Sequence, residues 1–115
     1  MQTQPVTNQT NFNGRIIFEK GTTTELTKYT PDPIWRKYLE IAAMVKNKSY
    51  DIFIMKDKNN EGFYNISANK SIEDAKKVKE YSVRVKSDVI KDSIVNAAQD
   101  AIDMYEKFIA KNCKG

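Results

Sequence analysis

The sequence contains no histidine, and its only cysteine among 115 residues is Cys113. Without histidine, one chain cannot form a Ser-His-Asp or Cys-His catalytic group, a histidine-ligated zinc site or a histidine general base. A single cysteine also excludes an internal disulfide and a cysteine cage for zinc or an iron–sulfur cluster. We therefore expect no metal, no cofactor and no catalytic residue, and we interpret Cys113 as incidental.

Glycine and long apolar runs are scarce as well. The four glycines do not have the spacing of a phosphate-binding loop. No stretch approaches the ~18 uninterrupted apolar residues of a membrane span, and the polar N-terminus lacks the features of a signal peptide. These absences predict a cytoplasmic protein without membrane contact. Residues 1–11 are expected to form a flexible polar tail and residues 12–115 a single globular domain.

Hydrophobic residues make up 40% of the chain, enough for a folded core. Arg15 to Glu19 form the first expected strand, and residues 21–31 are expected to form a loop with at most one helical turn. Residues 50–55 are almost continuously apolar, which predicts a central strand covered on both faces. A turn at 56–62 and a strand at 63–68 complete a hairpin, with Tyr64, Ile66 and Ala68 on one face.

The first helix is expected to begin at Asp32 as N-cap, with Pro33 in its first turn. Apolar residues then recur at helical spacing as far as Val45. Trp35 and Leu39 are expected to widen the apolar face of this helix.

Residues 71–86 allow two interpretations. Ser71 and Asp74 resemble a capping box before a short helix, and residues 81–86 alternate as a strand does. The alternative is one helix from Ser71 to Lys111, because neither glycine nor proline interrupts this stretch. We favour the helix followed by a strand.

The last helix, roughly Ser87 to Lys111, has the clearest pattern. Its apolar stripe includes Ile90, Ile94, Ala101 and Tyr105, and its acidic residues lie mostly on the other side. The complete order predicts an α+β fold, in which a small antiparallel-rich sheet of three or four strands packs against two main helices. The longer of the two helices is C-terminal.

Two groups of side chains are candidates for binding. Six basic residues lie between positions 70 and 86: Lys70, Lys76, Lys77, Lys79, Arg84 and Lys86. The same segment contains three acidic residues, Glu73, Asp74 and Glu80, so its local charge is +3. The basic residues could contact phosphates or a protein partner. Tyr29, Trp35 and Tyr38 form the second group, a candidate aromatic recognition patch, although aromatic residues near an apolar face more often belong to the core.

Oxygen-bearing residues between Asp57 and Gly62 resemble part of a calcium loop. The twelfth position, however, is Ala68 rather than glutamate, and Lys58 adds a positive charge. We therefore interpret this segment as a hairpin turn.

These observations predict a non-enzymatic binding module that acts through protein–protein contact, as an adaptor, inhibitor or assembly subunit. Its partner is another protein or a second copy of the chain, and a bacterial or phage accessory protein would have these features. The alternative is a nucleic-acid-binding domain that uses the basic segment 70–86. Nucleic acid is the less favoured partner, because domains of that kind usually contain more arginine than the three present here.

Overall fold

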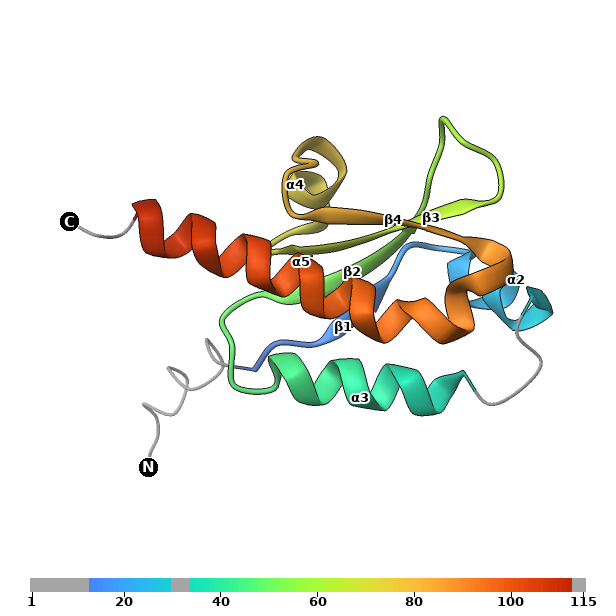
Figure 1. The fold of residues 1–115 in the computed structure, drawn as a ribbon, viewed down its shortest axis with the longest axis horizontal. Helices are drawn as coiled ribbons and strands as arrows, with labels where there is room; N and C mark the ends of the chain where they lie inside the picture. Colours follow the sequence, from blue (N-terminus) through green and yellow to red (C-terminus); the bar gives the residue numbers. More distant parts are fainter. Residues whose placement is uncertain (1–12, 30–33, 113–115) are drawn as a thin grey trace, which may run out of the picture.

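The computed structural model describes residues 13–29 and 34–112, and it contains one four-stranded sheet in the order β1-β2-β3-β4 (Figure 1). β1 (Ile16–Phe18) is parallel to β2 (Asp51–Lys56). β3 (Phe63–Asn69) and β4 (Ser82–Lys86) continue the sheet as an antiparallel meander. The expected tail at residues 1–11 lies outside the described residues.

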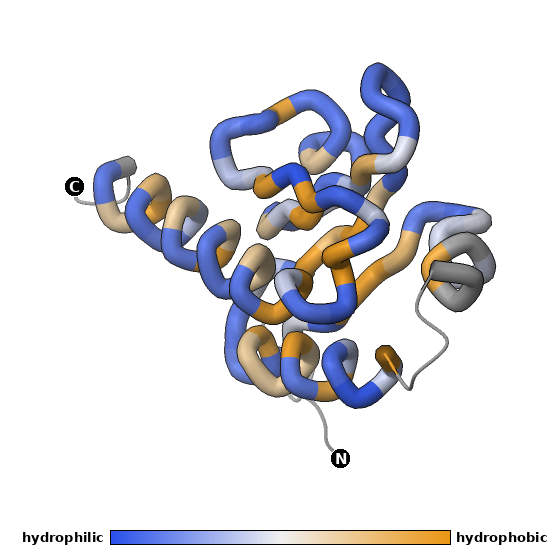
Figure 2. The backbone as a smooth tube through the Cα atoms, turned by 45° about the vertical axis from the view of Figure 1, so that its right-hand side comes forward, coloured by the Kyte–Doolittle hydropathy of each residue, from blue (hydrophilic) through white to orange (hydrophobic). Residues whose placement is uncertain are grey.

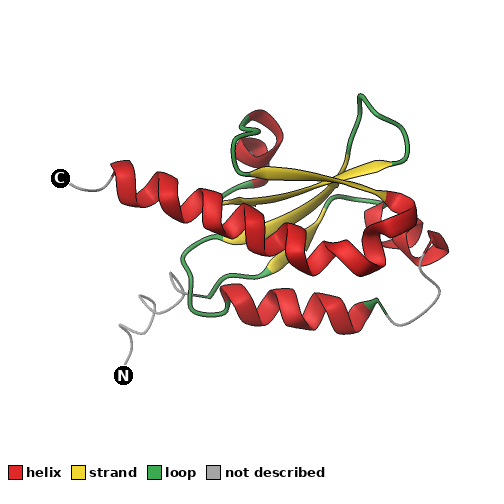
Figure 3. Cartoon of the chain, viewed as in Figure 1, coloured by secondary structure: helices red, strands yellow, loops and turns green. Residues whose placement is uncertain are grey.

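Two helices, α3 (Trp35–Val45) and α5 (Ile90–Asn112), lie side by side over one face of the sheet (Figures 1 and 3). A short 3-10 turn, Ser87–Val89, joins β4 to α5. The small helix α4 (Ile72–Lys77) lies on the opposite face. The predicted α+β class, with its longest helix at the C-terminus, is confirmed.

The core lies between the sheet and the helix pair (Figure 2). Tyr64, Ile66 and Ala68 of β3 all point into it, and each is at most 1% exposed. The predicted stripe of α5 packs on the same core, with Ile90, Ile94, Ala101 and Tyr105 buried. Strand alternation and helical periodicity therefore predict the same buried surface that the structure contains.

The segment 71–86 forms a short helix followed by a strand, as favoured from the sequence. The Ser71 hydroxyl accepts a hydrogen bond from the Asp74 N–H group at 3.2 Å, which satisfies a free donor at the start of α4. The extended backbone at Val78 (φ −95°, ψ 114°) then ends the helix. The alternative of one helix from Ser71 to Lys111 is wrong.

Residues 22–29 differ from the expectation, because they form the eight-residue helix α2 (Thr22–Tyr29) rather than a loop with one turn. Leu26 of α2 is fully buried in the main core. Tertiary burial of one side chain therefore stabilises a helix whose threonines have low helix propensity. None of the helices in the two described ranges is both long and apolar enough to cross a lipid bilayer.

The start of α3 also differs in part. Asp32 and Pro33, the expected cap and first residue, lie outside the described residues, and the described helix begins after Ile34. Trp35 is 55% exposed and Leu39 is 60% exposed, so neither widens the buried face of the helix. Only Ile41 and Val45 of α3 are fully buried, because this helix contacts the core along a narrow stripe.

Two contacts hold the ends of the sheet and helices together. A Cβ atom at Gly14 would lie 2.2 Å from the Tyr50 carbonyl oxygen and 2.4 Å from that of Val45, so only glycine fits there. At the other contact, the Tyr50 hydroxyl donates a short hydrogen bond to Glu106 of α5. Lys48 forms an ion pair with the same carboxylate at 2.8 Å.

Candidate functional site

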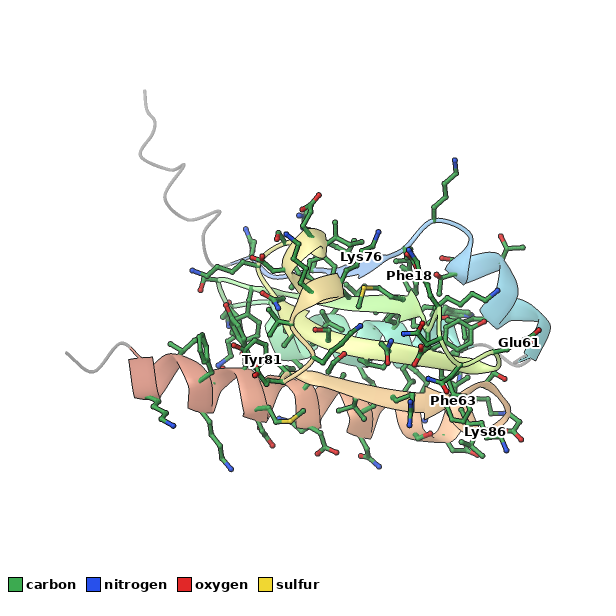
Figure 4. All side chains as sticks on the ribbon, turned by 90° about the horizontal axis from the view of Figure 1, so that it is seen from above. Phe18, Glu61, Phe63, Lys76, Tyr81 and Lys86 are labelled. Atoms are coloured by element: carbon green, nitrogen blue, oxygen red, sulfur yellow. The ribbon has the colours of Figure 1, made fainter. Side chains whose placement is uncertain are left out.

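The six basic residues predicted as a binding surface are distributed over four segments, and Lys70 lies in the first of them, the loop between β3 and α4. Lys76 and Lys77 lie on α4, Lys79 on the connector to β4, and Arg84 on β4 itself. Three of the six side chains face carboxylates: Lys76 with Glu19 at 3.6 Å, Arg84 with Asp57 at 4.0 Å, and Lys86 with Asp88 at 4.0 Å. Figure 4 shows Lys76 and Lys86 well apart. The residues do not form one continuous basic cluster.

The candidate aromatic patch is also divided. Trp35 is exposed, and the Arg36 guanidinium lies 5.6 Å from the centre of its ring. Tyr38 instead packs edge-on against Phe18, with 4.8 Å between ring centres, and burial raises the pKa of Tyr38 to about 12. The side chain of Tyr29 lies outside the described part of the chain. Trp35 and Tyr38 therefore occupy different environments.

The predicted hairpin turn between β2 and β3 is confirmed. Both carboxylate oxygens of Asp57 accept hydrogen bonds within the turn, from the Asn59 N–H group at 3.0 Å and the Asn60 side-chain amide at 3.3 Å. Gly62 adopts a positive φ of 87°, as turn glycines often do. No group of three acidic or cysteine side chains within residues 13–29 and 34–112 is arranged to hold a metal ion.

The sheet has two outer strands, β1 and β4, and the outer edge of β4 is a candidate recognition surface. β4 pairs with β3 on one side, and no strand of the described chain pairs with its other side. Two hydrogen bonds show which residues of β4 bond to β3: Ser87 N–H donates to Gly62 O (2.8 Å), and Ala68 N–H donates to Tyr81 O (3.2 Å). Counting from these two pairs, Val83 and Val85 face β3 with their backbone groups. Because antiparallel strands alternate their bonding direction, the N–H and C=O groups of Arg84 and the N–H group of Lys86 point outward, whereas the Lys86 C=O group begins the 3-10 turn Ser87–Val89. We call this row the β4 edge.

Side chains of opposite character lie on the two sides of the β4 edge. Towards α5, Val83, Val85 and the half-exposed Val89 line a groove of about 230 Å³ between the strand and the helix. On the other side of the strand lie Arg84 and Lys86. Ser93, Asn96 and Asp100 of α5 also line the groove, so the edge is mainly apolar on one side and basic on the other.

The position of Arg84 on this surface is fixed by two contacts. Its guanidinium lies 4.0 Å from an Asp57 carboxylate oxygen and 5.3 Å from the centre of the Phe63 ring. Burial alone would raise the pKa of Asp57, but hydrogen bonds from Asn59 and Asn60, together with the Arg84 charge, lower it below its ordinary value of 3.8. Asp57 therefore remains ionised and orients Arg84 across the sheet.

Sequence reasoning located the strand at 81–86 but not its position at the edge. A local signal was present: the alternation Val83-Arg84-Val85-Lys86 combines apolar residues with cations, and cations are typical of exposed edge strands. Strand order, however, depends on pairing between distant segments. Comparisons of the chain with models of protein families, with curated proteins and with solved structures find no match.

Proposed function

We propose that this protein is a non-enzymatic binding module that acts through protein–protein contact, and that the partner adds an extended segment to the β4 edge. The observation that supports this proposal is the outward row of backbone groups at Arg84 and Lys86 beside an open groove. Strand addition uses main-chain hydrogen bonds for affinity and alternate side chains for specificity.

The chemistry on either side of the edge defines the partner. Side chains of an added strand alternate between the two faces of the sheet. Those on the side of Arg84 and Lys86 would meet positive charge, and those on the other side would enter the groove beside Val85 and Val89. The partner segment is therefore one in which acidic and apolar residues alternate. The short contact implies an affinity on the order of micromolar, as in other small transient interfaces.

The same charges disfavour a second copy of the chain as the partner. If two β4 strands paired antiparallel about Arg84, the two Arg84 side chains would lie opposite each other. A register shift by two residues, with the two-fold axis at Val85, would place Arg84 opposite Lys86. Like charges directly opposite in a sheet are destabilising, so we favour a different, acidic protein over self-association.

Nucleic acid remains the alternative partner, through the basic segment 70–86. Its excess of positive charge supports this alternative. The carboxylate partners of Lys76, Arg84 and Lys86 weaken it, since each ion pair reduces the charge available to a phosphate.

Replacing Arg84 with proline tests the strand-addition proposal. Proline removes the outward N–H group but no ladder bond to β3, because the Arg84 N–H group faces away from that strand. The matched control is Arg84→Ala, which removes the charge but keeps the N–H group. The probe is a synthetic peptide of alternating glutamate and valine, and its counterpart is a peptide of alternating lysine and valine.

We expect the acidic peptide to shift the amide NMR signals of Arg84 and Lys86 saturably, and the basic peptide to leave them unchanged. Arg84→Pro should weaken binding about tenfold or more, which corresponds to losing one well-formed hydrogen bond. Arg84→Ala should weaken it less. The proposal is wrong if the acidic peptide leaves the β4 signals unchanged at about a hundred times the expected dissociation constant. A single-stranded oligonucleotide that binds with a steep salt dependence would favour the alternative instead.

A further inference from the structure

The face of the sheet opposite α3 and α5 has two halves of different chemistry. Near β1 and β2, the apolar side chains Phe53 and Met55 pack beneath Ala75 of α4. Near β3 and β4, the side chains on this face are polar: Asn65, Ser67, Ser82 and Arg84. Two adjoining hollows, of about 340 and 290 Å³, lie over the polar half and share Asp57, Asn59, Asn65 and Lys79. We call them together the polar hollow.

The polar half of this face contains two buried serine hydroxyl groups that have no hydrogen-bond partner in the described part of the chain. Ser67 is fully buried, and within the described residues its hydroxyl has no hydrogen-bond partner. The buried hydroxyl of Ser82 is likewise unpaired within that part of the chain, and Ser82 lines the hollow. The two serines are opposite each other in the β3–β4 ladder. An unsatisfied buried hydroxyl is unfavourable, so this pair of polar side chains is not explained by packing.

The charges around the polar hollow favour an anion. Its lining contains five cationic side chains and two carboxylates, an excess of three positive charges. Both carboxylates are already engaged: Asp57 by Asn59, Asn60 and Arg84, and Glu19 by the Lys56 N–H group and the Lys76 ammonium. Lys79, in contrast, forms no ion pair with any described residue. Its ammonium group is therefore available to a ligand.

We propose that the polar hollow is a binding site for a small oxyanion, with the phosphate group of a small molecule as the preferred ligand. Lys79 supplies a positive charge that no described carboxylate pairs with, Arg84 supplies a second charge that it shares with Asp57, and the Asn65 side-chain amide supplies a short-range donor. A phosphate dianion with three terminal oxygens matches this charge excess and number of donors better than a carboxylate does. The larger hollow lies within the range of about 300–1,000 Å³ that is typical of small-molecule sites.

This site shares the Arg84 side chain with the proposed protein contact, but Lys79 and Asn65 belong to it alone, whereas the protein contact uses the backbone of the β4 edge. An NMR titration with inorganic phosphate at constant ionic strength tests it, with chloride as the reference anion and acetate as the carboxylate probe. The key variant is Lys79→Met, which removes the free ammonium from an exposed position. The matched control is Lys107→Met, an equally exposed lysine on α5, outside the polar hollow.

We expect phosphate to shift the side-chain amide of Asn65 and the backbone amides of residues 79–82 saturably, while chloride leaves them unchanged. Lys79→Met should weaken phosphate binding about tenfold, the effect of losing one charge-assisted hydrogen bond, and Lys107→Met should leave it unchanged. Equal weakening by both variants, or shifts that do not saturate, would overturn the site. Acetate binding as tight as phosphate binding would overturn the preference for phosphate.

Discussion

Each strand of the sheet contributes alternate residues to two faces. The two faces differ in how many hydrogen-bonding groups they leave without a partner. In β3, Ile66 points towards the helices and is buried among apolar side chains, whereas its neighbour Ser67 points the other way, and its hydroxyl has no partner among residues 13–29 and 34–112. The helix-covered face thus stabilises the fold through the burial of apolar side chains. The opposite face retains charge and hydrogen-bonding capacity, and for that reason we assign ligand binding to it.

The largest loss of stability is expected for Ile66→Ala, which tests the packing of the helix-covered face. Ile66 is fully buried beneath α5, and a large-to-small substitution at such a site typically lowers the free energy of unfolding by about 2–5 kcal/mol. Urea denaturation followed by circular dichroism measures this loss. A loss well below this range would show that the helix-covered face is less tightly packed than the structure indicates.

An intermediate effect is expected at Glu106, which ties α5 to the start of β2. The Lys48 ammonium and then the Tyr50 hydroxyl lower the pKa of Glu106 below its ordinary value of 4.5. A carboxylate whose pKa is depressed by folding stabilises the protein fully above its unfolded-state pKa, and this contribution disappears as the pH falls through the folded-state value. Glu106→Gln should therefore reduce stability by about 1 kcal/mol at neutral pH, discounted because the side chain is 42% exposed.

The pH dependence separates this effect from a general loss of packing. The difference between wild type and Glu106→Gln should shrink as the pH falls below 4.5. Asp100→Asn is the control, because Asp100 is an exposed carboxylate of the same helix and forms no ion pair with any described residue. A difference that stays constant from pH 7 to pH 3 would contradict the assigned role of the Glu106 carboxylate.

The smallest effect is expected for Ser67→Ala, one residue away from Ile66 on the other face. Removing an unpaired buried hydroxyl costs no hydrogen bond, so stability should change by less than about 0.5 kcal/mol and is expected to rise slightly. The same denaturation experiment measures it. A loss above about 1 kcal/mol would mean that the hydroxyl has a partner, and the contrast between the faces would then be weaker.

Much of the fold follows from local patterns. The alternation at Tyr64, Ile66 and Ala68 predicts the buried face of β3, and the stripe from Ile90 to Tyr105 predicts that of α5. The extent of α2 and the exposure of Trp35 and Leu39 could not be predicted in this way. They depend on which parts of a helix the core reaches, and periodicity alone does not contain this information.

The candidate sites were less accessible to sequence reasoning. The basic residues of segment 70–86 could be named, but their separation by ion pairs depends on Glu19 and Asp57, which are distant in sequence. The polar hollow likewise combines the turn after β2 with the connector before β4. Such sites become visible only when strand order and register are known.

The parallel pairing of β1 with β2 has a consequence for how the chain folds. β2, β3 and β4 are joined by short connections, whereas Ile16 must find Ile52 across the whole stretch that contains α2 and α3. The entropy of closing so long a loop is offset only once its contacts have formed, so we expect β1 to join the sheet after the other three strands and to leave it before them. Its departure would expose the apolar edge of β2, which is the surface most prone to pairing with the wrong chain.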